Sequence, residues 1–220
     1  MTGKMKETYV RLMEGAAIER ESRAIVERLM QEAGVRFPPD EHAVARRVVH
    51  ATADPSFLDS IRFSPGAVAR GVEAIRAKRL IICDVRMLAA GCTHAGEQVV
   101  CAIQDPAVIA MAREQGITRA AAAMRCLGGR LAGAVVAIGN APTALWTLME
   151  MAAQGGPVPA LVIGMPVGFV GAHESKLALS QGNLPFITNL SPRGGSPAAA
   201  AVVNALADLA KRPADKPCDG

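Results

Sequence analysis

The sequence predicts an α/β fold with a mostly parallel sheet and helices on both of its faces. From Ala134 onward, three strand-like apolar runs alternate with three helical patterns, and such alternation is typical of a parallel sheet. Each of these runs (134–138, 160–163 and 185–188) is followed by a glycine-containing turn. We therefore expect a Rossmann-like three-layer domain whose turns lie at the carboxyl ends of the strands, where ligands bind in such sheets.

The first part of the chain is expected to add helices and two further strands. The apolar periodicity of residues 8–33 indicates a long helix, and Asp40 is the predicted N-cap of a helix through Ala51. The remaining elements are, in chain order, a helix opened by Ser64-Pro65 and reaching Lys78, strands at 80–84 and 98–103, and helices at 106–116 and 119–131. One domain is predicted over residues 1–210, followed by a flexible tail over 211–220.

The composition excludes several classes of protein. Half of the 220 residues are hydrophobic but only 3% are aromatic, so the core must consist of Ala, Val, Leu, Ile and Met. The net charge of +4 is too small and too dispersed for nucleic-acid binding, whereas an acidic small molecule suits it. The uncharged stretch 151–172 is interrupted by glycine and proline, so no membrane-spanning helix is predicted there.

Cysteine usage indicates a reducing compartment. The five cysteines form no C-x-x-C pair and no zinc-type spacing, so neither a metal site nor a disulfide framework is predicted. The first seven residues lack the apolar stretch of a signal peptide. We therefore expect a cytoplasmic protein.

Three glycine-marked turns are the first candidates for a binding site: 139–145, 164–176 and 191–196. Glycine allows close approach of the backbone to a ligand, and helix N-termini present free N–H groups, so converging turns could hold several carboxylates. The candidate groups are Gly164, Gly168, Gly194 and Gly195, together with side-chain donors from Asn140, Ser175 and Ser196. No turn matches G-x-G-x-x-G or a P-loop, so a nucleotide cofactor is unsupported. Each turn, taken alone, could equally be an ordinary tight connection.

His50 is the leading candidate for proton transfer. It falls in the last turn of the predicted helix 40–51, three and four residues after Arg47 and Arg46. A helix C-terminus favours the imidazolium, whereas two arginines oppose it unless an anionic ligand neutralises them. An ordinary surface histidine is the alternative. His173 in the second glycine turn is a rival, His94 could belong to a binding loop over 91–96, and His42 is expected at the solvated surface.

Two arginines are candidates for carboxylate binding. Arg119 opens an alanine-rich helix, where its charge opposes the helix dipole unless an anion compensates it. Arg193 lies in the third glycine turn and can hold a carboxylate by two hydrogen bonds. A solvent-facing charge is the alternative for each.

These motifs resemble those of the precorrin-8X methylmutase family of cobalamin biosynthesis. The resemblance covers residues 9–209, and its two specific motifs are 139–145 and 164–176. The shorter motifs that accompany them are 18–25, 48–51, 82–84, 116–119 and 194–196.

This resemblance implies a homodimeric α/β isomerase whose substrate is a polycarboxylate corrinoid macrocycle. The implied reaction moves a methyl group from C11 to C12 of precorrin-8X, giving hydrogenobyrinic acid, or converts cobalt-precorrin-8 to cobyrinic acid. The resemblance places the proton-donating histidine at His50 and substrate contacts at Ser22, Thr93 and Arg119. Neighbouring enzymes of the pathway are candidate partners, and a rearrangement needs no cofactor.

Two other functions remain open from the residues. A non-catalytic tetrapyrrole-binding or carrier protein would need the glycine turns and arginines but not His50. An α/β enzyme acting on a phosphorylated metabolite would be expected to carry a phosphate-binding fingerprint, which the sequence lacks.

Overall fold

A six-stranded sheet forms the centre of the computed structural model, which describes residues 15–213. Its strands are ordered β1 (Ile61–Phe63), β6 (Phe186–Asn189), β5 (Leu161–Gly164), β4 (Val135–Ile138), β2 (Ile81–Cys83) and β3 (Val99–Val100). The pairs from β6 to β3 are parallel, with Val136 opposite Val162, whereas β1 runs antiparallel on the edge, with Arg62 opposite Thr188. The predicted mostly parallel sheet is confirmed.

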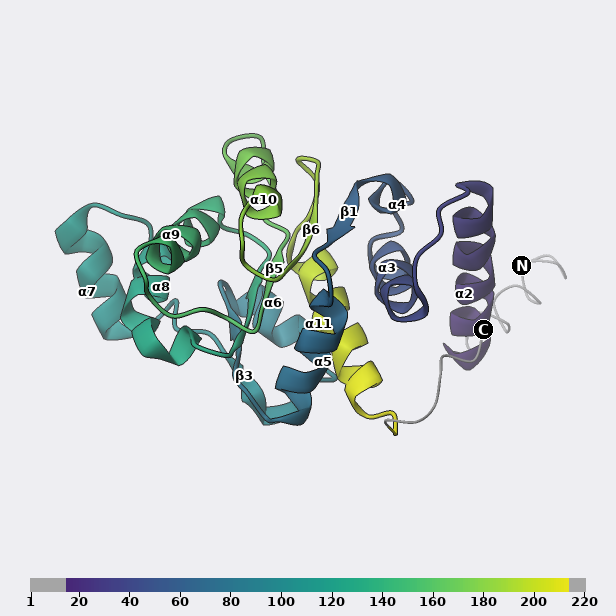
Figure 1. The fold of residues 1–220 in the computed structure, drawn as a ribbon, viewed down its shortest axis with the longest axis horizontal. Coiled ribbons are helices and arrows are strands. Elements are labelled where there is room, and N and C mark those ends of the chain that lie inside the picture. Colours follow the sequence, from purple (N-terminus) through teal and green to yellow (C-terminus); the bar gives the residue numbers. More distant parts are fainter. Residues whose placement is uncertain (1–14, 214–220) are drawn as a thin grey trace, which may run out of the picture.

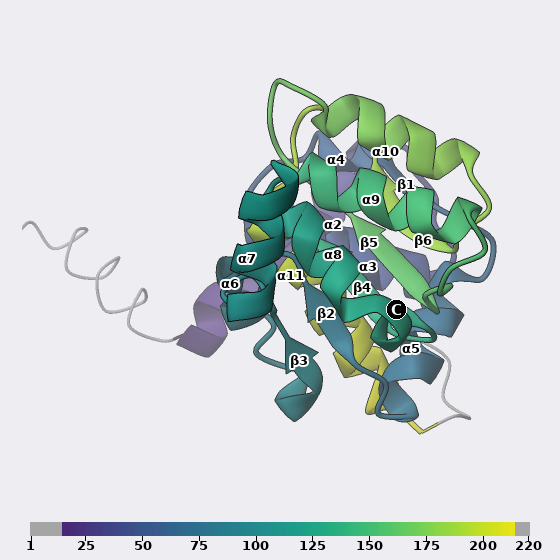
Figure 2. The ribbon, with the colours of Figure 1, turned by 90° about the vertical axis from the view of Figure 1, so that its left-hand side faces the viewer.

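Helices cover both faces of this sheet, as expected. One face carries α7 (Pro106–Gln115), α8 (Arg119–Leu127), α9 (Pro142–Ala153) and α10 (Ala172–Gln181), which lie in front of the strands in Figure 2. The other face carries α5 (Ala67–Arg76), α6 (Arg86–Gly91) and α11 (Ser196–Ala210). The 3₁₀ helices η1 (Gly96–Gln98) and η2 (Gly128–Leu131) complete this part of the chain.

The N-terminal helices extend the second face outward. α3 (Pro39–Thr52) packs on α11, the short α4 (Phe57–Ser60) follows it, and α2 (Gly15–Glu32) packs on α3 as the outermost element (Figure 1). Val26 and Met30 of α2 are buried in the same core as Val44 and Val48 of α3. α11 is therefore enclosed between the sheet and α3.

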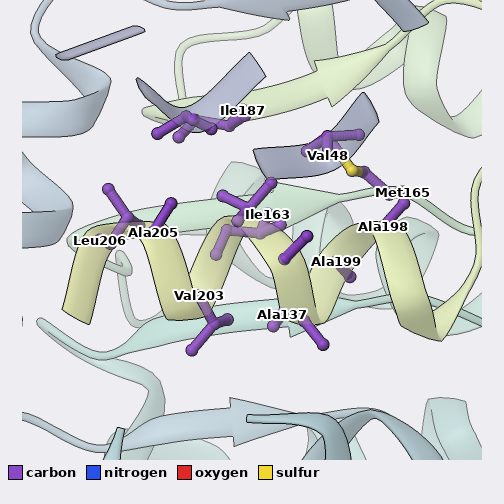
Figure 3. Packing of buried hydrophobic residues seen from close by; sticks show 14 of the residues in the cluster. Val48, Ala137, Ile163, Met165, Ile187, Ala198, Ala199, Val203, Ala205 and Leu206 are labelled. Carbon is purple, nitrogen blue, oxygen red and sulfur yellow. The ribbon is translucent and has the colours of Figure 1, made fainter. Parts of the chain in front are cut away.

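Small side chains allow α11 to occupy this central position. Its apolar residues are buried nearly all round, since strands pack on one side of it and helices on the other. Figure 3 shows Ala199 and Val203 of α11 together with Ile163 and Ile187 of the sheet. At Gly71 of α5, an added Cβ would lie 2.8 Å from Leu206, so the two helices touch where glycine permits it.

Local signals mispredicted several boundaries. Pro38 takes the N-cap position of α3, and Asp40 lies in the first turn, where a carboxylate still favours the helix dipole. The predicted strand 98–103 is reduced to Val99–Val100, and the predicted helix 119–131 ends at Leu127, before η2. The antiparallel β1 was not predicted, since three residues give too short a period to recognise.

Two expectations reach beyond the described residues. The predicted helix 8–33 is observed over Gly15–Glu32, while residues 8–14 fall outside the described part. Most of the predicted tail, 214–220, also lies outside it. Within residues 15–213, every helix is too short or too polar to cross a bilayer.

Candidate functional site

The three glycine turns meet at the carboxyl edge of the sheet. Gly195 donates its N–H to the carbonyl of Met165, 2.8 Å away, which joins the third turn to the second. A Cβ on Gly194 would lie 2.4 Å from the same carbonyl oxygen, and a Cβ on Gly139 would lie 2.9 Å from the Cα of Ser196. At Gly139 and Gly194, glycine is thus required because the turns approach one another closely there.

The N-terminus of α9 is occupied by an internal carboxylate. The strand order reverses between β2 and β4, the place where open α/β sheets bind ligands. Asp84, at the end of β2, is fully buried there and accepts the N–H groups of Gly139, Asn140 and Ala141 at 2.8–3.0 Å. Burial raises the pKa of the Asp84 carboxyl, and the three backbone N–H groups partly oppose that rise. These three backbone N–H groups are therefore not free to bind a substrate carboxylate, whereas the side chain of Asn140 is exposed.

Two predicted contact residues lie inside the fold. Gly164 ends β5, and an added Cβ there would lie 2.5 Å from Leu179, so this glycine satisfies a packing requirement. Ser175 is fully buried in α10 and donates its hydroxyl to the carbonyl of Ala172 at 3.0 Å. We therefore leave Gly164 and Ser175 out of the site. Gly168, by contrast, has φ +147° and open space where a Cβ would stand.

His50 and Ser22 are brought together from two helices. His50 lies in the last turn of α3, as predicted, and its ring is exposed. The Oγ of Ser22, on α2, lies 2.7 Å from Nδ1 of His50. This contact occupies one ring nitrogen, so Nε2 is the nitrogen left to meet a substrate.

A cavity of about 600 Å³ opens beside His50 between α2, α3, α6 and α11. Its floor includes Ala200, Ala201 and Ala205 of α11, and Ser196 lies at its edge. Four arginines and two carboxylates are among the residues that line it: Arg23, Arg46, Arg47, Arg212, Glu19 and Asp208. The excess of positive charge suits a polyanionic ligand.

The arginines near His50 are compensated by carboxylates of the chain itself. Arg46 pairs with Glu27 at 3.0 Å, and Arg47 pairs with Asp208 at 3.3 Å. Carboxylates of the chain itself thus partly neutralise these two arginines, whereas the sequence suggested only an anionic ligand in this role.

The other histidines occupy different surroundings. Nδ1 of His94 lies 2.8 Å from Asp208, and His42, predicted as an ordinary surface residue, lies 3.2 Å from Glu27. His173 is exposed in the first turn of α10 and does not line the cavity with His50.

Arg193 makes contacts within the protein through both its side chain and its backbone. Its guanidinium pairs with Asp54, which follows α3, and so joins the third glycine turn to the end of the helix that carries His50. Its carbonyl oxygen accepts hydrogen bonds from Lys176 Nζ at 2.5 Å and from Asn189 Nδ2 at 2.9 Å. The Arg193 side chain is exposed and contacts Asp54 through one nitrogen only, so binding of a substrate carboxylate by two hydrogen bonds stays a prediction.

The remaining predicted contacts lie apart from this cavity. Thr93 is exposed in the loop after α6 and donates its N–H to the carbonyl of Gly91, a residue of the cavity wall. Arg119 is exposed at the start of α8 and borders a second cavity of about 390 Å³ with Arg113. Among the predicted site residues, His50 and Ser196 thus line one cavity, whereas Ser22 is joined to it only through its contact with His50, and Thr93 and Arg119 lie outside its lining.

Sequence reasoning missed Asn204 and Asp208. Both line the cavity, and both come from α11, where they bond the loop after α6. The signal was present, because they are the two polar residues inside the otherwise apolar run 198–209 and are spaced one helical turn apart.

Comparison with known proteins identifies the same family over nearly the whole chain. The family model described as precorrin-8X methylmutase matches residues 17–209. Precorrin-8X methylmutase of Pseudomonas aeruginosa is 46% identical over 205 residues, covering 90% of this chain and 97% of the relative. Cobalt-precorrin-8 methylmutase of Methanothermobacter thermautotrophicus is 41% identical over 198 residues, covering 90% and 95%. The solved structure of the precorrin-8X methylmutase of Thermus thermophilus matches with a TM-score of 0.78 and 44% identity, covering 88% of this chain and 97% of that one.

Proposed function

Because the chain belongs to the precorrin-8X methylmutase family, isomerases of cobalamin biosynthesis, we propose that it moves a methyl group from C11 to C12 of its macrocycle. The substrate would be precorrin-8X, giving hydrogenobyrinic acid, or cobalt-precorrin-8, giving cobyrinic acid. The observation that carries the proposal is the position of His50 on the wall of an arginine-rich cavity, with one ring nitrogen held by Ser22.

In the proposed mechanism His50 acts as a general acid toward a nitrogen of ring C. The imidazolium donates Nδ1–H to the Oγ of Ser22 and gives its Nε2 proton to the macrocycle, which leaves the neutral ring with Nδ1–H still bonded to Ser22. Protonation makes the conjugated system electron-poor and so lowers the barrier to methyl migration. A positioned acid contributes about 10²–10⁴-fold, and holding the macrocycle in one pucker would contribute further.

Substrate carboxylates would be bound around this acid by basic and polar groups at the carboxyl edge of the sheet. Among the cavity residues, Arg23 and Arg47 would bind substrate carboxylates in place of their present partners, Glu19 and Asp208. The further proposed contacts are Ser196 in the cavity lining and, outside that lining, Ser22, Thr93, Arg119, Asn140, Gly168, Arg193, Gly194 and Gly195.

The test is to incubate the purified protein with precorrin-8X and, separately, with cobalt-precorrin-8, and to record absorption spectra and masses. A changed chromophore at unchanged mass is the expected result, with turnover lower by about 10²–10⁴-fold in His50→Ala. His42→Ala serves as the matched control, since it removes a histidine of the same helix that does not line the cavity. Turnover at the wild-type rate in His50→Ala would refute the acid role, and tight binding without conversion of either macrocycle would indicate a carrier.

We also propose that the protein is a homodimer. The loop after β5 exposes Phe169 completely and Val170 to 88%, and such apolar surface is commonly covered by a partner. Sedimentation velocity should give twice the mass of the 22.9 kDa chain. A monomer at micromolar concentration would contradict this.

We propose a cytoplasmic location because of the way the chain uses its cysteines. Cys83, Cys92, Cys101 and Cys126 are free thiols in the described residues, which suits a reducing compartment. Neighbouring enzymes of the pathway would then be the candidate partners for transfer of the macrocycle.

A further inference from the structure

We propose that Asn204 of α11 is a positioning residue that fixes the loop Gly91–His94 and thereby places Thr93 for substrate binding. The inference rests on the proposed function, because Thr93 is one of the groups proposed to contact the macrocycle. Its physical basis is a set of contacts that join α11 to this loop.

Asn204 holds the loop at two backbone groups. Its Oδ1 accepts the N–H of His94 at 3.0 Å, and its Nδ2 donates to the carbonyl of Gly91 at 2.8 Å. The side chain is buried, with 7% of the residue exposed. Its oxygen and its nitrogen each have a partner, and both partners belong to this loop. Asparagine is unfavourable inside a helix. Here its amide makes two hydrogen bonds to the loop, which the apolar side chains of α11 could not make.

A second anchor lies one helical turn further along α11. Oδ1 of Asp208 lies 2.8 Å from Nδ1 of His94. The ring of His94 is therefore held by Asp208, and its backbone N–H by Asn204. Arg47 of α3 contacts both partners, at 3.3 Å from Oδ2 of Asp208 and 3.3 Å from Nε2 of His94. Lys211 also lies 3.5 Å from the Asp208 carboxylate. The loop is therefore connected to the helix that carries His50.

The start of the loop lies directly against α11. A Cβ on Gly91 would stand 2.9 Å from the Cβ of Ala200, so this approach requires glycine on one side and a small residue on the other. Gly91 also accepts the N–H of Thr93 at 2.9 Å. Thr93 is thus an exposed residue between Gly91 and His94, whose backbone groups Asn204 holds. Gly91 belongs to the wall of the cavity.

Removal of the Asn204 amide should release this arrangement without unfolding the helix. In Asn204→Ala, the N–H of His94 loses its acceptor, while the Asp208–His94 contact remains. Alanine is also the best helix former, so α11 itself should persist. The expected consequence is a loop that samples several conformations, in which Thr93 is seldom in place.

The experiment has two parts, the first without ligand. Hydrogen exchange of loop 91–96 should be faster by about tenfold or more in Asn204→Ala, with exchange in the core strands unchanged. In the second part, binding of hydrogenobyrinic acid is titrated by absorbance. We expect affinity to fall about tenfold with kcat changed less than about threefold, because one contact made before the chemical step is lost.

A double-mutant cycle with Thr93→Ala identifies the route of the effect. If Asn204 acts through Thr93, affinity in the double variant should equal that of Asn204→Ala alone within about twofold. Val203→Ala, on the same helix but buried and outside the cavity lining, is the matched control for a general loss of stability. Unchanged loop exchange, fully additive losses, or the same loss of affinity in Val203→Ala would each overturn the proposal. Failure of the wild-type chain to bind or convert the macrocycle would instead refute the proposed function and leave the exchange result intact.

Discussion

Lys176 offers the sharpest test of how the site is held together. Its side chain is completely buried in α10, and its Nζ donates to the carbonyl of Arg193 at 2.5 Å, with Asn189 Oδ1 at 3.4 Å. Both acceptors are neutral. Burial therefore disfavours the ammonium and lowers the pKa of Lys176 from 10.5 to about 8.

The size and sign of the effect on stability follow from this shift. Below pH 8 the amine is protonated in both the folded and the unfolded chain, and burial of the charge costs the full difference, about 3 kcal/mol. Between pH 8 and 10.5 the unfolded chain keeps the proton while the folded chain releases it, so stability rises with pH. Relative to pH 7, the calculated gain is about 1.4 kcal/mol at pH 9 and about 2.5 kcal/mol at pH 10.

The assay compares wild type with Lys176→Met in urea unfolding between pH 7 and 10. Methionine removes the titrating amine and keeps an unbranched side chain, and the Arg193 carbonyl retains its hydrogen bond from Asn189. The difference in unfolding free energy should shift toward the wild type by the amounts above, since groups that titrate in both proteins cancel. Lys78→Met, at an exposed position after α5, should give a constant difference. A pH-independent difference for Lys176→Met would refute the argument that Lys176 is a buried cation.

Three further substitutions test the contacts around the site. Gly139→Ala should lower the unfolding free energy by about 1–3 kcal/mol, because its Cβ would stand 2.9 Å from the backbone of Ser196; an unchanged urea midpoint would show that the turns separate easily. Asp84→Asn should cost about 1–3 kcal/mol in the same assay, because an amide cannot accept all three N–H groups of the α9 turn, and wild-type stability would contradict the assigned contacts. Ser22→Ala should lower kcat about tenfold while leaving KM within twofold, since it frees the His50 ring without removing the acid. Equal activity of Ser22→Ala and wild type in the spectral assay would mean that Ser22 does not orient the ring.

Local pattern was sufficient for the second half of the fold and insufficient for the site. The alternation after Ala134 predicted β4 to α11, because each run has the length and period of its element. The partners of the site residues are distant in sequence: Ser22 is 28 residues from His50, and Asp84 is 55 from Gly139. Helix and strand periodicity relates residues only a few positions apart, so it cannot pair residues this distant. The sequence could therefore suggest His50 but not that Ser22 holds its ring.

The same limit explains why the sequence predicted the position of the glycine turns but not what each glycine contacts. Their position at the carboxyl edge follows from strand direction, which the alternation predicts. The function of each glycine depends on what faces it, which here is another turn or, at Gly164, the side chain of Leu179. The anion at the end of α9 was also expected, but it is Asp84 of the chain itself rather than a ligand.

The composition of the chain acquires a physical meaning once α11 is placed. A helix enclosed between a sheet and α3 needs side chains that are apolar, but large ones would fill the space beside His50. Ala200, Ala201 and Ala205 satisfy both demands, because they favour the helix and leave a cavity of about 600 Å³ open above them. The two polar residues within its apolar run 198–209, Asn204 and Asp208, line the same cavity and bond the loop after α6. The alanine-rich, aromatic-poor sequence is therefore suited to build an empty site around one central helix, which a core of large side chains would have closed.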